Sequence, residues 1–383
     1  MTALPGLATD VATTAPAEVP PTARRLASLD VARGVVVIAS VVLTTLSGPY
    51  AQRHALWYGL APIDLLFPSF VTLTGAALAL SLRRPLRPWR LARRTLVLLA
   101  AGLAFNLIVQ QSWELDRLRY PGVLQLIALV GLAVVVVARL LRSWWAPLLI
   151  AAAILIGYTV LLLRASGSCP QGLPQPHCNL PGSVDRAVFG IRHTYGAGVH
   201  GFDPEGLLST FGAMASGLIG LVAGLLVTRL RPRMVIPGLL GLAASSAAAS
   251  VVLAGWVPVA KRLWTPAFAC RASAAAVLLL AVCYLMADLG GGRSSRPGRL
   301  LRGVLWPVVA FGRNSLLVYF GKHLVALALS TVTVAGGVTL SDDLHRRLAG
   351  AGTYEPFAYA GVMLAGWVLV TAALHMRRWY LRA

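Results

Sequence analysis

The sequence predicts an all-α membrane protein: a polytopic helix bundle of about ten transmembrane helices, with both termini in the cytoplasm. Composition is the first reason, because 57% of the 383 residues are hydrophobic and only 12% are charged, whereas a soluble domain carries about 25% charged residues. The apolar residues also fall into separate runs, each close to the roughly 20 residues that cross a bilayer. Finally, arginine collects in alternate loops between these runs, as the positive-inside rule expects.

Residues 1–23 precede the first apolar run and are rich in Ala, Pro and Thr. They show no apolar periodicity and lack the pattern of a cleaved signal peptide, so we expect a disordered cytoplasmic tail. Residues 24–383 then form one transmembrane domain. Its predicted spans are 31–48, 63–82, 92–110, 122–141, 144–163, 206–228, 234–256, 266–288, 313–337 and 357–376.

The orientation follows from the arginine-rich loops, which are expected to face the cytoplasm. These loops are 83–94, 139–142, 229–233 and 293–302, together with the C-terminal segment 377–382. With an even number of helices, His54 and the long loop 165–204 then lie on the outer face. The formal net charge of +21 is explained by this topology, since the basic residues do not form one continuous face. We therefore expect the lipid bilayer as a partner and no nucleic acid. The scarcity of lysine beside abundant Ala, Gly, Arg and Pro is typical of a GC-rich bacterial genome and favours a bacterial plasma membrane.

Two cysteines, Cys169 and Cys178, lie in the predicted outer loop. In an oxidising compartment such a pair favours a disulfide, the alternative being two free thiols. The histidines of the same region, His177, His193 and His200, lack the spacing of metal ligands. We therefore predict no metal site.

His54 is the leading candidate for chemistry. It lies between the first two predicted spans, ten residues before Asp64, which places an imidazole at a membrane boundary. Imidazole is the side chain best suited to proton transfer near neutral pH, and ionisable groups at membrane depth are often functional. The alternative is an interfacial histidine that only bonds loop carbonyls.

Nine short segments, in this order, resemble the heparan-alpha-glucosaminide N-acetyltransferase family, the transmembrane acetyltransferases of lysosomes and their bacterial relatives. The segments are Arg25–Gly34, His54–Gly59, Asp64–Pro68, Gly122–Gln125, Val184–Arg186, His193–Tyr195, Asp203–Thr210, Lys261–Thr265 and Gly312–Ser315. The resemblance covers nearly the whole chain after residue 24. It implies an enzyme that takes acetyl-CoA from the cytoplasm as co-substrate and passes the acetyl group to an amino sugar or envelope glycan at the outer face. It also implies a homodimer.

Within the resemblance, the family's active histidine corresponds to His54, which would act as a general base or carry the acetyl group itself. Asp64 would orient His54 or hold the acceptor's amine, with helix capping as the structural alternative. The motif-bearing segments contribute candidate substrate-binding residues, of which Trp264, Asn314 and Tyr319 could also donate hydrogen bonds to an oxyanion. The substrate-binding candidates are Trp57, Asp203, Glu205, Lys261, Trp264, Asn314 and Tyr319.

On the cytoplasmic side, arginines are the natural anchors for the phosphates of coenzyme A, because guanidinium groups bind phosphate in a bidentate manner. The candidates are Arg33, Arg93, Arg94, Arg377 and Arg378. Topology alone also accounts for basic residues at these positions.

One position departs from the family. An asparagine usual in the first membrane helix is replaced by Thr44, which offers a hydroxyl instead of an amide. Either the acceptor differs, or Thr44 or Thr45 takes over part of the asparagine's role beside His54. An O-acyltransferase with a hydroxyl acceptor, and a transporter or scaffold without chemistry, therefore stay open as alternatives.

A seam of small residues with four-residue spacing runs along the predicted span 206–228. Such a seam allows close helix packing, either between subunits or within the bundle. Its members are Gly212, Ser216, Gly220 and Gly224.

Overall fold

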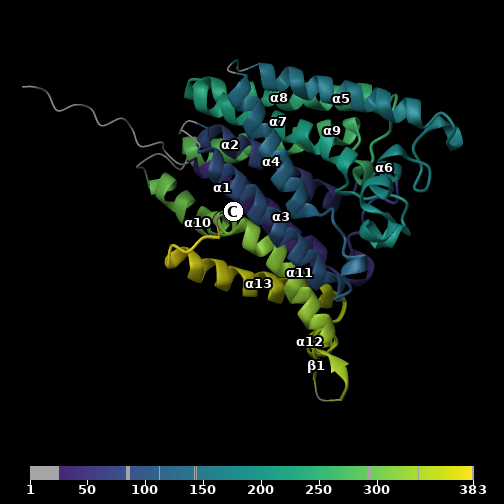
Figure 1. Ribbon diagram of the computed structural model, residues 1–383. Helices are drawn as coiled ribbons and strands as arrows, with labels where there is room; N and C mark the ends of the chain where they lie inside the picture. Colours follow the sequence, from purple (N-terminus) through teal and green to yellow (C-terminus); the bar gives the residue numbers. More distant parts are fainter. Residues whose placement is uncertain are drawn as a thin grey trace, which may run out of the picture.

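The computed structural model describes residues 26–82, 87–111, 113–141, 143, 145–290, 296–334 and 336–381. The predicted tail 1–23 lies outside the described residues, as do parts of the arginine-rich loops. Figure 1 shows a bundle of long helices. The helices are α1 (Ala27–Thr45), α2 (Leu66–Ser81), α3 (Pro88–Gln110), α4 (Val123–Leu140), α5 (Ala146–Ala165), α6 (Leu180–Phe189), α7 (Leu207–Arg229), α8 (Pro232–Ala254), α9 (Pro266–Cys283), α10 (Arg296–Arg313), α11 (Ser315–Thr331), α12 (Leu340–Leu348) and α13 (Glu355–Met376).

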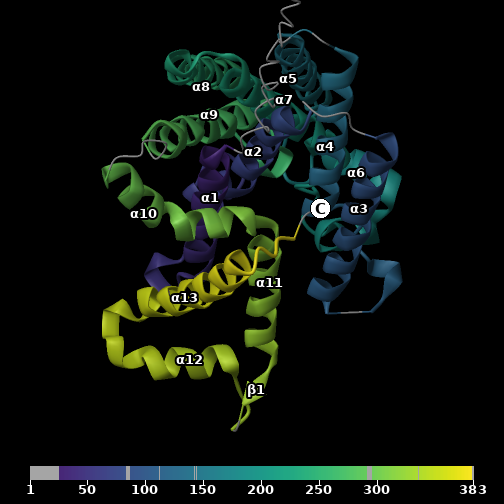
Figure 2. The same ribbon diagram turned by 90° about the vertical axis from the view of Figure 1, so that its left-hand side faces the viewer.

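The predicted all-α membrane bundle is confirmed. Nine helical stretches of the described chain are long and apolar enough to cross a membrane, or up to ten if α10 and α11, which meet at 71°, form one bent span. The predicted span 313–337 corresponds to α11, and the sequence pattern did not separate it from α10 at the bend. The strands described are β1 (Thr333–Val334) and β2 (Val338–Thr339), which pair antiparallel as a short hairpin. This hairpin and α12 lie at the end of the molecule away from α5 and α8 (Figures 1 and 2).

Helix α7 occupies the centre of the bundle, because its small residues let neighbouring backbones approach. A Cβ on Gly220 would lie 1.9 Å from the Thr72 carbonyl oxygen, and one on Gly224 would lie 2.2 Å from that of Ala76. On the other face, a Cβ on Gly212 would lie 2.1 Å from the carbonyl oxygen of Trp264, just before α9. The predicted small-residue seam therefore packs within the bundle, where close contact compensates for the lack of a hydrophobic driving force between helices in lipid.

A second close crossing joins α1 to α10. A Cβ on Gly34 would lie 2.0 Å from the Val308 carbonyl oxygen, and one on Gly312 would lie 1.7 Å from that of Asp30. Two residues after Gly312 the chain turns at Asn314 into α11. The glycines thus fix the point at which the α10–α11 break lies against α1.

The connections α1–α2, α3–α4, α5–α7 and α8–α9 meet at one end of the bundle, which we call the His54 side. Gly59 donates a backbone hydrogen bond to Val259 (2.8 Å), and Tyr120 donates one to His193 (3.0 Å). These bonds join loops that are far apart in sequence. The candidate site residues of several loops are thereby brought together.

Candidate active site

Asp64 organises the loop that carries His54. It lies in the 3₁₀ turn Pro62–Leu65 directly before α2, and one carboxylate oxygen accepts hydrogen bonds from the backbone N–H groups of Ala61 (2.9 Å) and Ala55 (3.2 Å). Acidic side chains satisfy free N–H groups well at helix starts. Asp64 therefore folds the segment around His54 back onto the start of α2.

The other oxygen of Asp64 lies 2.6 Å from Nδ1 of His54. Asp64 is fully buried, whereas the His54 side chain is 48% exposed. Because a carboxylate can only accept a hydrogen bond, this contact assigns the proton to Nδ1. The lone pair then lies on Nε2 of His54, which can accept a hydrogen bond or take up a proton.

Lys261 completes the cluster around His54. It begins the turn Lys261–Leu263 between α8 and α9, and its Nζ lies 2.9 Å from Nδ1 and 3.3 Å from Nε2 of His54. It is also 3.5 Å from Asp64. Burial lowers the pKa of Lys261, an effect that the nearby charges of Asp64 and Glu205 oppose. Lys261 therefore interacts electrostatically with both Asp64 and Glu205.

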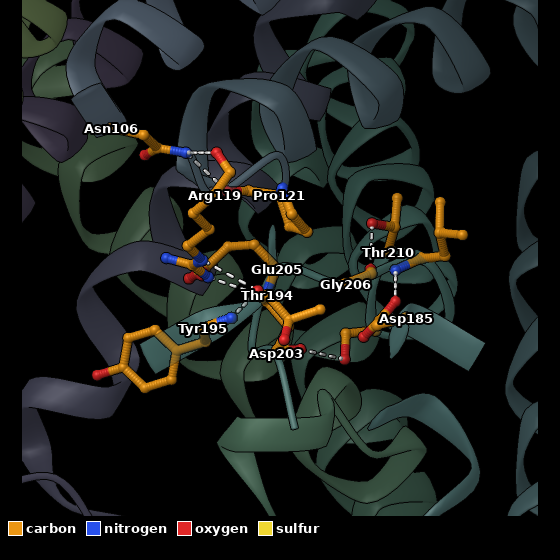
Figure 3. A network of polar contacts seen from close by, with 12 residues as sticks. Asn106, Arg119, Pro121, Asp185, Thr194, Tyr195, Asp203, Glu205, Gly206 and Thr210 are labelled. Atoms are coloured by element: carbon orange, nitrogen blue, oxygen red, sulfur yellow. Dashed lines mark hydrogen bonds and ion pairs between the residues drawn. The ribbon is translucent and has the colours of Figure 1, made fainter. Parts of the chain in front are cut away.

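A second polar network, shown in Figure 3, joins the α3–α4 loop to the start of α7. Nε of Arg119 donates to Asp203 at 2.9 Å, a second guanidinium nitrogen also bonds Asp203, and that nitrogen lies 2.5 Å from Glu205. The guanidinium covers the ring of Tyr195, 4.8 Å from its centroid. Although burial opposes charge on Arg119, Glu205 and Asp203 raise its pKa, so this arginine stays cationic.

The two polar networks adjoin through Glu205. Its carboxylate bonds Arg119, and its charge opposes the lowering of the Lys261 pKa by burial, so Glu205 couples the Arg119 network electrostatically to the His54 cluster. Its side chain is 12% exposed. Charges of both signs therefore surround a small region at the His54 side.

Asp185 of α6 lies beside this network (Figure 3). One oxygen accepts a hydrogen bond from the backbone N–H of Leu207 (2.8 Å) at the start of α7, and the other has no hydrogen-bond partner among the described residues. Gly206 makes this approach possible, since a Cβ there would lie 1.9 Å from the carboxylate. Burial raises the pKa of Asp185 to about 7.

The predicted disulfide between Cys169 and Cys178 is present, with Cα atoms 5.7 Å apart. Pro174, inside the loop it closes, accepts a hydrogen bond from the indole of Trp57 (2.9 Å) and another from the Tyr58 hydroxyl. The disulfide loop therefore supports the segment that follows His54. Burial raises the pKa of Tyr58, so its hydroxyl stays protonated and donates to Pro174.

Several predicted substrate residues are engaged inside the bundle. The Trp264 indole donates to Ser216 (3.2 Å) and is almost fully buried. Asn314 donates to the Ala310 carbonyl (3.0 Å) at the α10–α11 break, and its side-chain oxygen has no hydrogen-bond partner in the described part of the chain. The ring of Tyr319 lies 6.2 Å from that of Phe67.

Among the described residues, no hydrogen bond joins Thr44 to His54. Its hydroxyl donates to the Ser40 carbonyl oxygen (2.7 Å) and lies 3.1 Å from Nζ of Lys322, from which it accepts. The neighbouring Thr45 donates to Val41 (2.8 Å). The threonine hydroxyl thus faces a buried lysine of α11.

A cavity of about 360 Å³ lies at the other end of the bundle, near the beginnings of α1, α3 and α11. Of the five predicted phosphate anchors, Arg33 and Arg94 line it, together with Arg313. Ser315, in the first turn of α11, also lines the cavity. Tyr380 lines it too, and its ring centroid lies 3.7 Å from the guanidinium carbon of Arg313. The other three predicted anchors are exposed and do not line the cavity: Arg93, Arg377 and Arg378.

Three residues described above were not predicted from the sequence as site residues: Arg119, Arg313 and Lys322. Arg119 had one signal, because two acidic residues expected on the same face, Asp203 and Glu205, required a cation. Arg313 lay within a quoted motif but was assigned no role. Lys322 had none beyond being one of two lysines in the chain, since its contacts with α1 join residues 282 positions apart.

A protein-family model and two known proteins are similar in sequence to this chain. The sequence model of the family described as "Heparan-alpha-glucosaminide N-acetyltransferase, catalytic" matches residues 25–170, a range that includes His54, Asp64 and Arg119. The human protein named heparan-alpha-glucosaminide N-acetyltransferase is 28% identical over 370 residues, covering 78% of this chain and 53% of the human protein. The resemblance to the heparan-alpha-glucosaminide N-acetyltransferase family is confirmed.

The mouse heparan-alpha-glucosaminide N-acetyltransferase is 25% identical over 374 residues, covering 79% of this chain and 54% of the mouse protein. The chain therefore spans about half the length of the curated relatives it matches. Because both alignments cover more than three quarters of the chain, the similarity extends beyond the segment that the family model matches.

Proposed function

We propose that this chain is a membrane-bound acetyltransferase that moves an acetyl group from cytoplasmic acetyl-CoA to an amino sugar or envelope glycan on the outer face. The observation that carries the proposal is the His54–Asp64 pair, with Nζ of Lys261 3.3 Å from Nε2 of His54. A proton acceptor held in one orientation is what attack by an amine on a thioester requires. The match to the acetyltransferase family supports the same chemistry.

In the proposed reaction, the acceptor nitrogen attacks the carbonyl carbon of the thioester. Nε2 of His54 takes the proton that the nitrogen loses, while Asp64 holds Nδ1–H and stabilises the imidazolium that forms. The C–S bond then breaks, and the departing thiolate of coenzyme A receives that proton. The products are an acetylated amine and free coenzyme A, and His54 returns to its starting state.

The arginine-lined cavity supports the donor part of the proposal. Arg33, Arg94 and Arg313 place three cations around a space into which the first turn of α11 also opens. Phosphates bind well at helix N-termini and to guanidinium groups. The pantetheine arm would then extend toward His54 beside Phe70, which lines the cavity, and Tyr319, whose ring stacks on Phe70 at 6.1 Å.

Glu205 and Asp203 support the acceptor part. Both carboxylates lie at the His54 side, and one Arg119 guanidinium bonds both. An amino sugar brings an ammonium group that a carboxylate attracts. This group releases one proton to solvent to become the neutral amine, and His54 takes the second proton when the amine attacks the thioester. We place the acceptor between Glu205 and His54, and the arginine-rich loops at the opposite end in the cytoplasm.

The test is acetyl-CoA turnover by the purified protein in nanodiscs, with glucosamine and other amino sugars as acceptors. We expect acceptor-dependent release of free coenzyme A, reduced about 10²–10⁴-fold by His54→Ala. His345→Ala is the matched control, because His345 also contacts a carboxylate through Nδ1, but on α12. Equal turnover by the wild type and His54→Ala contradicts the proposal, and so does the absence of both binding and turnover. Acetylation of neutral sugars alone would replace the amine acceptor by a hydroxyl.

A further inference from the structure

Lys322 is a cation inside the helix bundle, and the reaction steps proposed above give it no role. It lies on α11 with 8% of its surface exposed. Its Nζ donates to the Ser40 carbonyl oxygen (3.1 Å), the Ser40 hydroxyl (2.5 Å) and the Thr44 hydroxyl (3.1 Å). Within the described ranges, no carboxylate forms a salt bridge with it.

This arrangement holds the ammonium in place without neutralising it. A charge buried in a membrane protein is costly unless it is paired, and intramembrane lysines usually face a partner or a pathway. Here all three N–H groups point to neutral oxygens of α1. The full positive charge of Lys322 therefore acts on whatever comes near it.

The position of Lys322 relates it to the proposed donor route. Ser315, at the start of α11, lines the arginine-rich cavity, and Lys322 follows seven residues later, about 10 Å along the helix. Tyr319 lies between them, with its ring centroid 5.5 Å from Nζ. The same ring packs on Phe70 at the cavity and on Phe67, three residues after Asp64.

We propose that the Lys322 ammonium stabilises the negative charge that develops on the thioester carbonyl oxygen during acyl transfer. This inference rests on the proposed function. As the acceptor nitrogen bonds to the carbonyl carbon, the C=O electron pair moves onto oxygen, and a fixed cation lowers the energy of that state. When the C–S bond breaks, the pair returns to form the amide carbonyl. Lys322 forms no covalent bond and keeps its three protons.

In this proposal, the thioester carbonyl oxygen replaces the Thr44 hydroxyl as the acceptor of one Lys322 N–H. Thr44 is exposed, so of the three oxygens bonded by Lys322 its hydroxyl belongs to the residue nearest the surface of the bundle. Its hydroxyl also donates to the Ser40 carbonyl oxygen and therefore keeps a hydrogen bond when that N–H turns away. The two bonds to Ser40 hold the ammonium during the exchange.

The test compares Lys322→Met and Lys322→Arg with the wild type in steady-state turnover of acetyl-CoA. We expect Lys322→Met to lower kcat by about 10²–10³-fold with the KM for acetyl-CoA nearly unchanged, and Lys322→Arg to restore part of kcat. His323→Gln is the matched control, because it changes the next residue of the same helix, which is exposed. Its kcat should match the wild type. If the KM rises and kcat does not fall, Lys322 serves donor binding and the proposal is wrong.

A spectroscopic measurement separates this role from a structural one. Acetyl-CoA labelled at the carbonyl carbon is bound to His54→Ala and to the double variant His54→Ala with Lys322→Met, and the carbonyl stretch is recorded by isotope-edited infrared difference spectroscopy. We expect a lower frequency in the protein that retains Lys322. Equal frequencies overturn the inference.

The two proposals fail in different ways. A wild-type protein without turnover on any acceptor contradicts the acetyltransferase itself. A wild-type protein that turns over, with Lys322→Met equally active and equally stable to heat, contradicts only the role of Lys322.

Discussion

The structure contains two histidine–carboxylate pairs that look alike in sequence and differ in their surroundings. His54 with Asp64 and His345 with Glu355 are both separated by ten residues, and both contact the carboxylate through Nδ1. Asp64 is fully buried, whereas the Glu355 side chain is 20% exposed. The ring of His345 stacks on Tyr359 at 4.1 Å and fastens α12 to α13.

The difference in surroundings is the basis on which we propose different roles for the two pairs. His54 has a second charged neighbour in Lys261 and a carboxylate held by two backbone N–H groups. The ring of His345 instead lies flat against a tyrosine, which restricts access to it. We therefore propose that the first pair takes part in the chemistry and that the second attaches α12 to α13.

Neutralising each carboxylate should separate the two pairs most clearly. Asp64→Asn keeps an oxygen for the two backbone N–H groups but removes the charge that holds Nδ1–H. We expect kcat for acceptor-dependent release of coenzyme A to fall by about 10³–10⁴-fold, as in other histidine–aspartate systems. Glu355→Gln should leave kcat within about twofold, because surface charges away from a site contribute little. Equal losses in the two variants would refute the distinction.

The arginine-lined cavity would also distinguish the two pairs, since it would serve only His54 and Asp64. Arg94→Met removes one cation from its lining. We expect the KM for acetyl-CoA to rise about tenfold, equivalent to about 1.4 kcal/mol, with kcat little changed. Arg93→Met, at the neighbouring exposed position, is the control in the same kinetic assay. A rise in KM for both variants would indicate general attraction by the basic surface.

The disulfide loop offers a third contrast, because it supports the His54 segment and not the His345 pair. Replacing both Cys169 and Cys178 by Ser opens a short loop, and chain entropy alone predicts a loss of about 2–3 kcal/mol. We expect a lower thermal midpoint and a lower kcat than for the wild type, measured in the same detergent. An unchanged kcat would show that Trp57 and Tyr58 need no support from this loop.

The smallest change that we predict is in the pH dependence of thermal stability. Asp185 has a native pKa raised to about 7 from 3.8, so the folded protein retains a proton that the unfolded chain loses between these values. Its contribution to stability is therefore present at low pH and is lost as the pH rises through 7. We expect the thermal midpoint of the wild type to fall by a few degrees relative to that of Asp185→Asn between pH 5 and pH 8. Parallel curves would refute the assignment.

Much of this architecture could be predicted from local sequence. Apolar runs located the long helices, and the position of Asp64 after Pro62 predicted a helix start near His54. The bend at Asn314 could not be predicted, because it depends on the contact of Gly312 with α1. The amphipathic α12 lay inside a stretch interpreted as a loop, since nine residues are too few for a span.

The site was predicted only in part, because several of its contacts join residues that are far apart in sequence. A residue type and its neighbours in sequence suggested His54, Asp64 and Glu205, but pairing across the bundle leaves no local pattern. The contact of Lys322 with Ser40 and that of Arg119 with Asp203 arise only once distant helices pack. The resemblance placed Thr44 near His54 in function, whereas the packing of α11 places its hydroxyl against Lys322.

The backbone oxygen of Pro174 has a consequence for how the protein matures. Two aromatic side chains from the His54 segment share this oxygen, and it belongs to a ring of residues closed by the cystine. Before the thiols are oxidised, the segment that bears this oxygen has one covalent restraint fewer. We therefore expect the loop after His54 to be held less firmly in the reduced chain than in the oxidised one, although their sequences are identical.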